Sequence, residues 1–298
     1  MDWRQFAMDL ETLNPDAVEE IFARHGASSI TLTDASDRPV LEPAPGETPL
    51  WRDTRITGLF SPDADLSALR TDLLQSLSID DLPENEVSVL ADRAWEHEWR
   101  RDFGPMQFGS RLWICPGDSS VDDDVAVVLR LDPGLAFGTG THASTALCLD
   151  WLDGLNLHGL TVLDYGCGSG VLAIAALLLG SDSAVAMDID PQAVVATQNN
   201  ATRNNVDGQL TVVGCANEID GTFDVVVANI LANPLIELAE PIARRVNGGC
   251  VLALSGILSE QVDQVLEAYR PWIEFDEPVT RQHDAQTWAR LTGRRIEG

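Results

Sequence analysis

One stretch of this chain has residue types and a spacing that could do chemistry. It contains three glycines, each separated from the next by a single residue. Residues 161–170 read TVLDYGCGSG, and an apolar run from 171 to 179 follows. This pattern predicts a short buried strand, a glycine turn and a helix packed on the strand. Glycine lets backbone approach a ligand where a Cβ would collide. The helix N-terminus adds unpaired N–H groups with positive partial charge.

The glycine spacing and the acid before it narrow the kind of ligand. The pattern is GxGxG, whereas dinucleotide folds use GxGxxG, in which the third glycine allows close packing beneath a pyrophosphate. Asp164 adds a carboxylate at the end of the strand, an acceptor that a phosphate would not favour. A ligand with an amine and a ribose, such as S-adenosylmethionine, suits both features.

A second acid follows the next predicted strand, Ser183–Met187. Asp188 comes about 20 residues after Gly166, where a carboxylate lies close to a bound ribose. Asp190, followed by Pro191, is instead predicted to be the N-cap of a helix over 191–203. Together the turn and Asp188 indicate a nucleoside ligand.

A carboxamide ends another predicted buried strand. Residues 223–230 read FDVVVANI, an apolar run typical of parallel strands, and Asn229 lies near its end. The carboxyl ends of such strands form the crevice where α/β sheets bind ligands. Leu210–Val213 predicts a further strand, with residues 215–217 as adenine-side contacts beyond it.

The stretch before the first of these strands, residues 132–142, is rich in glycine and threonine and leads into a helix predicted over 143–155. Its composition favours a lid over a ligand, with a plain surface connection as the alternative. His142 is a tempting general base. A hydrogen-bonded structural role explains it equally well, and we leave it out of catalysis.

Alternating strands and helices must position these residues. From residue 105 onward the pattern predicts a doubly wound α/β sheet. Strands are also expected at 106–115, 125–131 and 250–255, a helix at 259–269, and an antiparallel closing hairpin near 273–279 and 287–293.

A smaller unit precedes this domain. Residues 1–93 read as a βαββαβ ferredoxin-like α+β unit without catalytic features, which favours an accessory or recognition role. Its expected elements are strands at 3–10, 29–33, 54–60 and 86–90, and helices at 15–25 and 65–77. Residues 94–104 are predicted to be a helical linker, with Trp95 and Trp99 on one face.

Composition bounds the class of protein. The 298 residues suit about two domains, and no apolar run approaches the ~20 residues of a membrane span. The first residues lack the features of a signal peptide. Five cysteines without framework or metal spacing predict reduced thiols in a cytoplasmic protein and no metal site.

The net charge of −28 is spread over the chain, and all 19 basic residues are arginine. Attraction to a basic partner is one interpretation. Solvation in a salty cytoplasm is the interpretation we prefer, because a partner site would concentrate charge in one domain. Non-specific nucleic-acid binding is disfavoured without a basic patch.

The chain resembles the class I S-adenosylmethionine-dependent methyltransferases, and within them the PrmA family of bacterial enzymes that modify large-subunit ribosomal protein eleven. The resemblance covers nearly the whole chain. It is carried by LDPGLAFGTGTH at 131–142, DYGCGSG at 164–170 and NILA at 229–232. Two departures are Ala143-Ser144, where the family often has Pro-Thr, and the absence of lysine.

The resemblance implies a Rossmann-like methyltransferase domain at 105–298 and a substrate-recognition domain at 1–93. It implies S-adenosylmethionine as cofactor, and lysine side chains and the N-terminal amine of the ribosomal protein, free or on the ribosome, as substrate. A monomer is expected. The cofactor-binding positions that it implies are Thr145, Gly166, Asp188 and Asn229, with Asp164, Gly168, Phe137 and Thr141 less directly supported.

We assign these residues hypothetical roles. Asn229 would orient the target amine and the cofactor through its carbonyl oxygen, and Asp188 would bind the ribose hydroxyls. Asp164 would lie near the cofactor amine, while Gly166 and Gly168 would contact its methionine part through their backbone. Since an ammonium has no lone pair, the site must favour neutral amine by desolvation or accept its proton through water.

Three other functions remain open. The first is a methyltransferase that acts on RNA, a small molecule or a protein side-chain amide, although the Asn-Pro-Pro-aromatic pattern of amide methyltransferases is missing at 229–232. A nicotinamide-dependent oxidoreductase is disfavoured by the GxGxG spacing. A non-catalytic, ribosome-associated protein that retains the nucleoside pocket is the fourth interpretation.

Overall fold

The structure is a computed structural model that describes residues 3–34, 53–90, 104–117, 119–131, 142–283 and 285–297. The chain divides into two compact units, Met1–Glu98 and Trp99–Gly298. Each unit is described by itself. The helical linker predicted at 94–104 lies outside the described residues except for Gly104, and so do Phe137 and Thr141 of the predicted lid.

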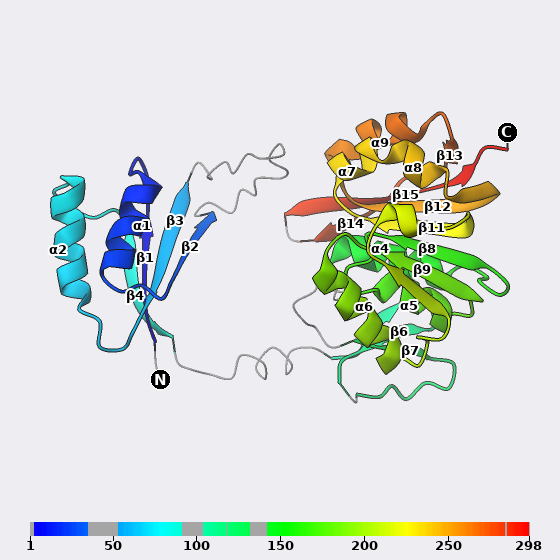
Figure 1. The fold of residues 1–298 in the computed structure, drawn as a ribbon, viewed down its shortest axis with the longest axis horizontal. Coiled ribbons are helices and arrows are strands. Elements are labelled where there is room, and N and C mark those ends of the chain that lie inside the picture. Colours follow the sequence, from blue (N-terminus) through cyan, green and yellow to red (C-terminus); the bar gives the residue numbers. More distant parts are fainter. Residues whose placement is uncertain are drawn as a thin grey trace. The chain divides into compact units, whose positions relative to one another are not determined.

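The N-terminal unit has the predicted βαββαβ order (Figure 1). Its sheet is antiparallel throughout, with strand order β2-β3-β1-β4. Its elements are β1 (Trp3–Asp9), α1 (Pro15–Arg24), β2 (Ser29–Asp34), β3 (Thr54–Phe60), α2 (Leu66–Leu77) and β4 (Asn85–Leu90).

Local sequence chemistry places both helices of this unit. Asn14 Oδ1 accepts the backbone N–H groups of Asp16 and Ala17, and Pro15 occupies the first helical position of α1, as predicted. Asp65 caps α2 in the same way. Phe22 of α1 packs edge-on against Phe6 of β1 at a centroid distance of 5.8 Å, within the core of the unit. The apolar faces of both helices are therefore buried against one face of the sheet.

The C-terminal unit contains an eight-stranded sheet, a three-stranded sheet and the helices that cover them (Figure 1). Its strands are β5 (Met106–Phe108), β6 (Leu112–Cys115), β7 (Val127–Arg130), β8 (Thr161–Tyr165), β9 (Ser183–Met187), β10 (Leu210–Val213), β11 (Phe223–Asn229), β12 (Val246–Leu258), β13 (Ile273–Phe275), β14 (Val279–His283) and β15 (Gln286–Arg295). Its helices are α4 (Ala143–Asp153), α5 (Val171–Leu178), α6 (Pro191–Arg203), η1 (Ala216–Glu218), α7 (Ala232–Glu237), α8 (Ala239–Ala243), η2 (Ser259–Gln261) and α9 (Val262–Tyr269).

The large sheet is doubly wound and runs in the order β10-β9-β8-β11-β12-β15-β13. Strands β10, β9, β8, β11 and β12 are parallel, whereas β15 is antiparallel to β12 and to β13. The predicted sheet with an antiparallel closing strand is thereby confirmed. The long β15 enters between β12 and β13 and also pairs with β14, which the sequence pattern did not resolve.

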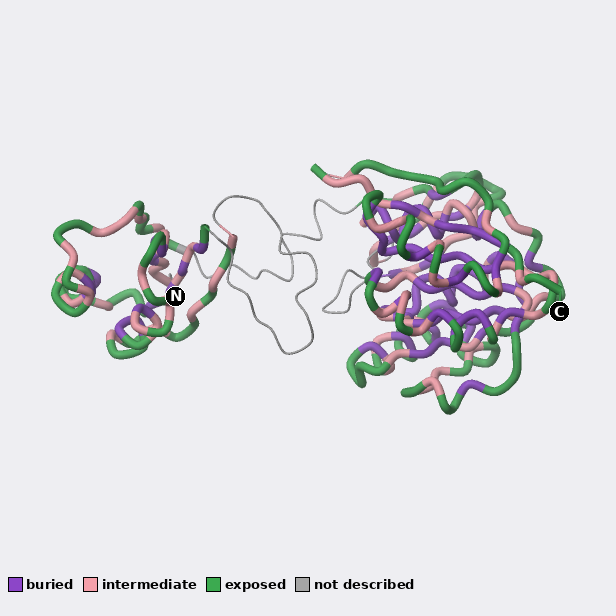
Figure 2. The backbone as a smooth tube through the Cα atoms, turned by 90° about the horizontal axis from the view of Figure 1, so that it is seen from above, coloured by how far each residue is buried: buried purple, intermediate pink, exposed green. Residues whose placement is uncertain are grey.

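Side chains alternate between two cores on the two faces of this sheet. In β11, Val225 and Val227 face the core that includes α4 and α5, while Val226 and Ala228 face the core that includes α7, α8 and α9. Buried backbone runs through the interior of the unit and exposed turns lie outside it (Figure 2). The continuous apolar run of β11 is thus explained by burial on both faces.

Three predicted elements had wrong boundaries. The strand expected near 273–279 is two strands, β13 and β14, which both pair with β15. The single strand expected at 106–115 is two strands, β5 and β6, because Gly109 adopts a positive φ of 62° and reverses the chain. The strand expected from Cys250 begins at Val246, since Gly248 and Gly249 continue the strand through a register shift instead of forming a separate turn. Among the described helices, none is both long and apolar enough to cross a bilayer.

Candidate active site

The glycine turn follows β8 at the centre of the sheet and leads directly into α5. Gly166, Gly168 and Gly170 have φ values of 78°, 54° and 76°. The backbone N–H of Gly166 donates to the carbonyl of Met187 at 2.8 Å, and that of Gly170 donates to Cys167 at 2.8 Å. The predicted strand, turn and helix are therefore present, and the turn is tied to the end of β9.

Protein side chains, as well as backbone geometry, require glycine in this turn. A positive φ is strained for any L side chain. A Cβ at Gly166 would overlap Ile230 Cγ2, and one at Gly170 would lie 2.6 Å from Thr197 Cγ2. The sequence interpretation placed a ligand where such a Cβ would collide. At Gly166 and Gly170 the structure shows that the colliding group is a protein side chain, Ile230 or Thr197, and not a ligand.

Asp164 lies beneath the turn and is only 1% exposed. Its Oδ2 accepts the backbone N–H of Ala173 at 3.0 Å, so it supplies an acceptor to the first turn of α5, whose N-cap residue, Gly170, has no side chain. Its Oδ1 is buried without a hydrogen-bond partner. Burial raises the pKa of the Asp164 carboxyl to about 7, with Ala173 opposing this shift and the charge of Asp188 adding to it. Proximity to a cofactor amine stays a prediction.

Asp188 follows β9 and holds two backbone groups. Its Oδ2 accepts the N–H of Gly168 at 2.8 Å, and its Oδ1 accepts the N–H of Asp190 at 3.0 Å. Asp190 accepts the N–H of Gln192, which confirms it as the N-cap of α6. Each carboxylate oxygen of Asp188 has a further lone pair with which to accept a hydroxyl. The side chain thus joins the turn to the end of β9, a contact that sequence spacing did not predict.

Asn229 and Thr145, 84 positions apart in the chain, are brought together at the end of β11. Asn229 Nδ2 donates to Thr145 Oγ1 at 3.1 Å, and Asn229 Oδ1 is buried without a hydrogen-bond partner. Thr145 lies in the first turn of α4 and is 2% exposed. The carbonyl oxygen is the only acceptor of the Asn229 side chain, and it is available to accept a hydrogen bond from a ligand.

Two residues of β12 pack beside Asn229 and Thr145, and neither was predicted from the sequence to be part of the site. Ser255 is fully buried, and its Oγ lies within hydrogen-bond distance of two carbonyl oxygens. One is that of Ser144, the residue before Thr145, at 3.2 Å, and the other is that of Ala289 at 3.1 Å. Gly256 has a φ of 83°, and a Cβ there would overlap the backbone carbonyl of Ile230. The only sequence signal was a Ser-Gly pair interrupting an apolar strand.

His142 begins α4. Its side chain caps the helix by accepting the N–H of Ser144, and its Nδ1 lies 2.8 Å from Ser144 Oγ. Its ring packs edge-on against Trp288 at a centroid distance of 4.3 Å. These contacts give His142 a structural role at the start of the helix. The adenine-side contacts predicted at 215–217 stay a prediction, with η1 following β10 at that place.

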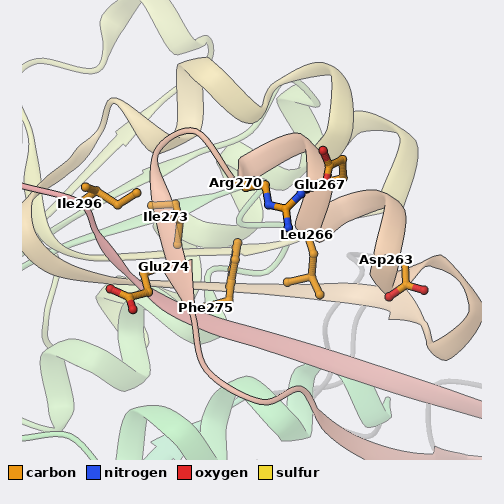
Figure 3. Close-up of a pocket in the computed structure, with 8 residues that line it drawn as sticks. All are labelled: Asp263, Leu266, Glu267, Arg270, Ile273, Glu274, Phe275 and Ile296. Atoms are coloured by element: carbon orange, nitrogen blue, oxygen red, sulfur yellow. Dashed lines mark hydrogen bonds and ion pairs between the residues drawn. The ribbon is translucent and has the colours of Figure 1, made fainter.

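A groove of about 720 Å³ lies elsewhere in this unit, between α9, β13 and the C-terminal residues (Figure 3). Three strands, β11, β12 and β15, separate β13 from β8 in the sheet. Of the predicted cofactor-binding residues that the structure describes, none lines this groove, and its size alone does not make it the ligand site. The lining residues are Asp263, Leu266, Glu267, Arg270, Ile273, Glu274, Phe275 and Ile296.

The polar groups gathered at the carboxyl ends of β8, β9 and β11 lie where doubly wound sheets bind nucleosides. Three features together define the class I S-adenosylmethionine-dependent methyltransferases: a parallel sheet with antiparallel β15 inserted between β12 and β13, a GxGxG turn after β8, and an acid after the neighbouring strand β9. The fold and site place this chain in that class.

Comparison with known proteins narrows the class to a family. The model of the ribosomal protein L11 methyltransferase (PrmA) family matches residues 2–296, and the chain belongs to that family. It is 49% identical over 297 residues to the ribosomal protein L11 methyltransferase of Hahella chejuensis, covering 99% of each chain. It is 46% identical over 295 residues to that of Nitrosococcus oceani, covering 99% of this chain and all of the relative.

A crystal structure of the ribosomal protein L11 methylase of Lactobacillus delbrueckii subsp. bulgaricus also resembles this one. It matches with a TM-score of 0.59 at 31% identity, and the match covers 65% of this chain and all of the other. The fold likeness and the sequence relatives therefore point to one family.

Proposed function

We propose that this protein transfers methyl groups from S-adenosylmethionine to amines of ribosomal protein L11, namely lysine side chains and the N-terminal amine. Family membership over residues 2–296 supports the reaction class and the substrate. The single observation that carries the site assignment is the Asn229–Thr145 pair, which leaves a buried carbonyl oxygen unpartnered beside the glycine turn. A buried acceptor of this kind is costly unless a ligand satisfies it.

The residues present fit S-adenosylmethionine. The turn backbone at Gly166 and Gly168 suits the methionine part, and Asp188 keeps lone pairs for the ribose hydroxyls. Asp164 supports the turn from beneath. When bound, S-adenosylmethionine supplies a methyl group on a positively charged sulfur, which is already an activated leaving group.

The residues of the site align the amine with the methyl group and favour the amine in its neutral form. Asn229 Oδ1 accepts an N–H of the incoming amine and so directs its lone pair toward the methyl group. Because the surroundings of Asn229 and Thr145 are largely buried, they favour the neutral amine over the ammonium. Alignment alone supplies a large share of the acceleration in such displacements.

The domain roles belong to the same proposal. Residues 1–93 act as the substrate-recognition domain with a ferredoxin-like fold, residues 94–104 as a helical linker, and residues 105–298 as the methyltransferase domain. The N-terminal unit has its own antiparallel four-stranded sheet and its own core, which supports a domain separate from the methyltransferase domain. A ribosomal substrate also favours a cytoplasmic enzyme, and a monomer belongs to the same proposal. The displacement as written needs no metal.

Methyl incorporation into purified L11 tests the proposal. Labelled S-adenosylmethionine, this protein and L11 should give labelled lysine and N-terminal residues by mass spectrometry, and the Asn229→Ala protein should give at least tenfold less at equal cofactor saturation. Ribosomal RNA offered instead of L11 should stay unlabelled. Binding of S-adenosylmethionine without incorporation would favour a ribosome-associated binding protein, and binding of NAD in its place would favour an oxidoreductase.

A further inference from the structure

Helix α6 brings two polar side chains to the glycine turn. Thr197 is fully buried, and its Oγ1 donates to the carbonyl oxygen of Gly168 at 3.0 Å. Asn200 Nδ2 donates to the carbonyl oxygen of Ser169 at 2.8 Å. Since residues three apart share a helix face, α6 reaches two successive peptide groups of the turn.

These contacts orient the amide groups of the turn. None of the described peptide bonds is cis, and a trans peptide group is planar, with its C=O and N–H pointing in opposite directions. Holding the carbonyl of Gly168 toward α6 therefore directs the N–H of Ser169 away from α6. The same argument applies to the carbonyl of Ser169 and the N–H of Gly170, which donates to Cys167.

Thr197 also fits the turn by shape. A Cβ added at Gly170 would lie 2.6 Å from its Cγ2, and Cys167 Sγ lies 3.4 Å from its Oγ1. A buried hydroxyl costs free energy unless it is hydrogen-bonded. An aliphatic side chain at Thr197 would avoid that requirement. The hydroxyl is instead satisfied by two groups of the turn, the carbonyl oxygen of Gly168, to which it donates, and the thiol of Cys167.

We infer that Thr197 and Asn200 are positioning residues for the cofactor turn, and that they set the affinity for S-adenosylmethionine through the turn backbone. The inference rests on the proposed function in one respect, that this turn binds S-adenosylmethionine. A turn held in its binding conformation before the ligand arrives spares the cost of ordering it on binding. Neither residue takes part in methyl transfer itself.

Calorimetric titration of S-adenosylmethionine into full-length variants tests the inference. Thr197→Val removes the hydroxyl at nearly constant volume, Asn200→Ala removes the amide, and Thr197→Ser keeps the hydroxyl. Thr202→Val is the matched control, because Thr202 Oγ1 donates to Gln198 within the same helix and away from the turn. We expect Kd to rise about tenfold for Thr197→Val and for Asn200→Ala, the scale of one hydrogen bond. Thr197→Ser and Thr202→Val should stay within about twofold of wild type.

Steady-state kinetics separates positioning from catalysis and from simple destabilisation. The KM for S-adenosylmethionine should rise with Kd, while kcat at saturating cofactor stays within about twofold of wild type. Unchanged Kd in Thr197→Val and Asn200→Ala, with only a lowered unfolding temperature, would overturn the inference and leave the proposed function intact. If wild type itself bound no S-adenosylmethionine, both would fall.

Should Thr197→Val fail to fold, Asn200→Ala decides the matter, because Asn200 is only partly buried and alanine favours the helix. An unchanged Kd in a folded Asn200→Ala protein would then overturn the inference.

Discussion

Replacing Asp164 by asparagine should change how the stability of the C-terminal unit depends on pH. Burial raises the pKa of Asp164 from 3.8 to about 7 in the folded protein. A carboxyl whose folded pKa is raised keeps its proton in the folded state after the unfolded chain has lost it. Its stabilising contribution is therefore complete below the unfolded pKa and is lost as pH rises through the folded pKa.

The magnitude follows from the size of the shift. Between pH 4 and pH 7 each pH unit should remove about 1.4 kcal/mol of the free energy of unfolding, up to about 4 kcal/mol in all. Asparagine has almost the same shape, and its amide oxygen can still accept the N–H of Ala173. The variant should lack this pH dependence, so between pH 5 and pH 8 wild type should lose about 3 kcal/mol relative to it.

Urea unfolding of both proteins at pH 5, 6, 7 and 8 measures the difference. Comparing the two proteins at each pH cancels the contributions of titrating groups that do not interact with Asp164. If the two units unfold in separate transitions, the one whose midpoint changes in Asp164→Asn belongs to the C-terminal unit. The exposed Asp207→Asn is the control for loss of one charge from a chain of net charge −28. Parallel stability curves for wild type and Asp164→Asn would refute the reasoning about burial.

Three further perturbations have clear expected outcomes. Asp188→Ala should weaken S-adenosylmethionine binding by roughly 10- to 100-fold in a calorimetric titration. The substitution removes the acceptor of two backbone N–H groups as well as the proposed ribose contact. An unchanged affinity would refute the assignment of Asp188 to the ribose. Thr145→Val deprives Asn229 Nδ2 of its acceptor and should lower kcat by about tenfold in the L11 assay, with Thr145→Ser close to wild type. Gly256→Ala should lower the free energy of unfolding by about 2–4 kcal/mol, because Gly256 has a φ of 83° and an added Cβ would overlap the carbonyl of Ile230. Gly248→Ala, at a position with no obstructing atoms, is the comparison. A smaller loss of stability in Gly256→Ala than in Gly248→Ala would contradict this prediction.

Much of the fold followed from local chemistry. Asn14 with Pro15 and Asp190 with Pro191 begin helices where the sequence placed them, because a cap needs only a side-chain oxygen and the next few N–H groups. The apolar run before Asn229 predicted a buried parallel strand for a similarly local reason. The errors arose at glycines, where one residue type permits both the reversal at Gly109 and the continued strand at Gly249.

The sequence predicted candidate residues for the site but not the contacts between them. Spacing and resemblance pointed to Gly166, Asp188 and Asn229. Nothing in the order of residues indicated that Asp188 would hold the N–H of Gly168, or that Asn229 would donate to Thr145. Those contacts join residues from different strands and a helix. They therefore depend on which strands are neighbours in the sheet, which the sequence alone does not specify.

The sequence by itself determined the glycine turn, because positive φ at three alternate positions is a requirement that only residue type can meet. It also determined the alternation of strands and helices and, through its similarity to a family, the reaction class. Tertiary structure alone decided what surrounds the turn: Ile230 against Gly166, Thr197 against Gly170, and a buried carboxyl of Asp164 beneath α5. The physical reason is that packing and desolvation depend on neighbours distant in the chain, whereas backbone conformation depends on the residue itself.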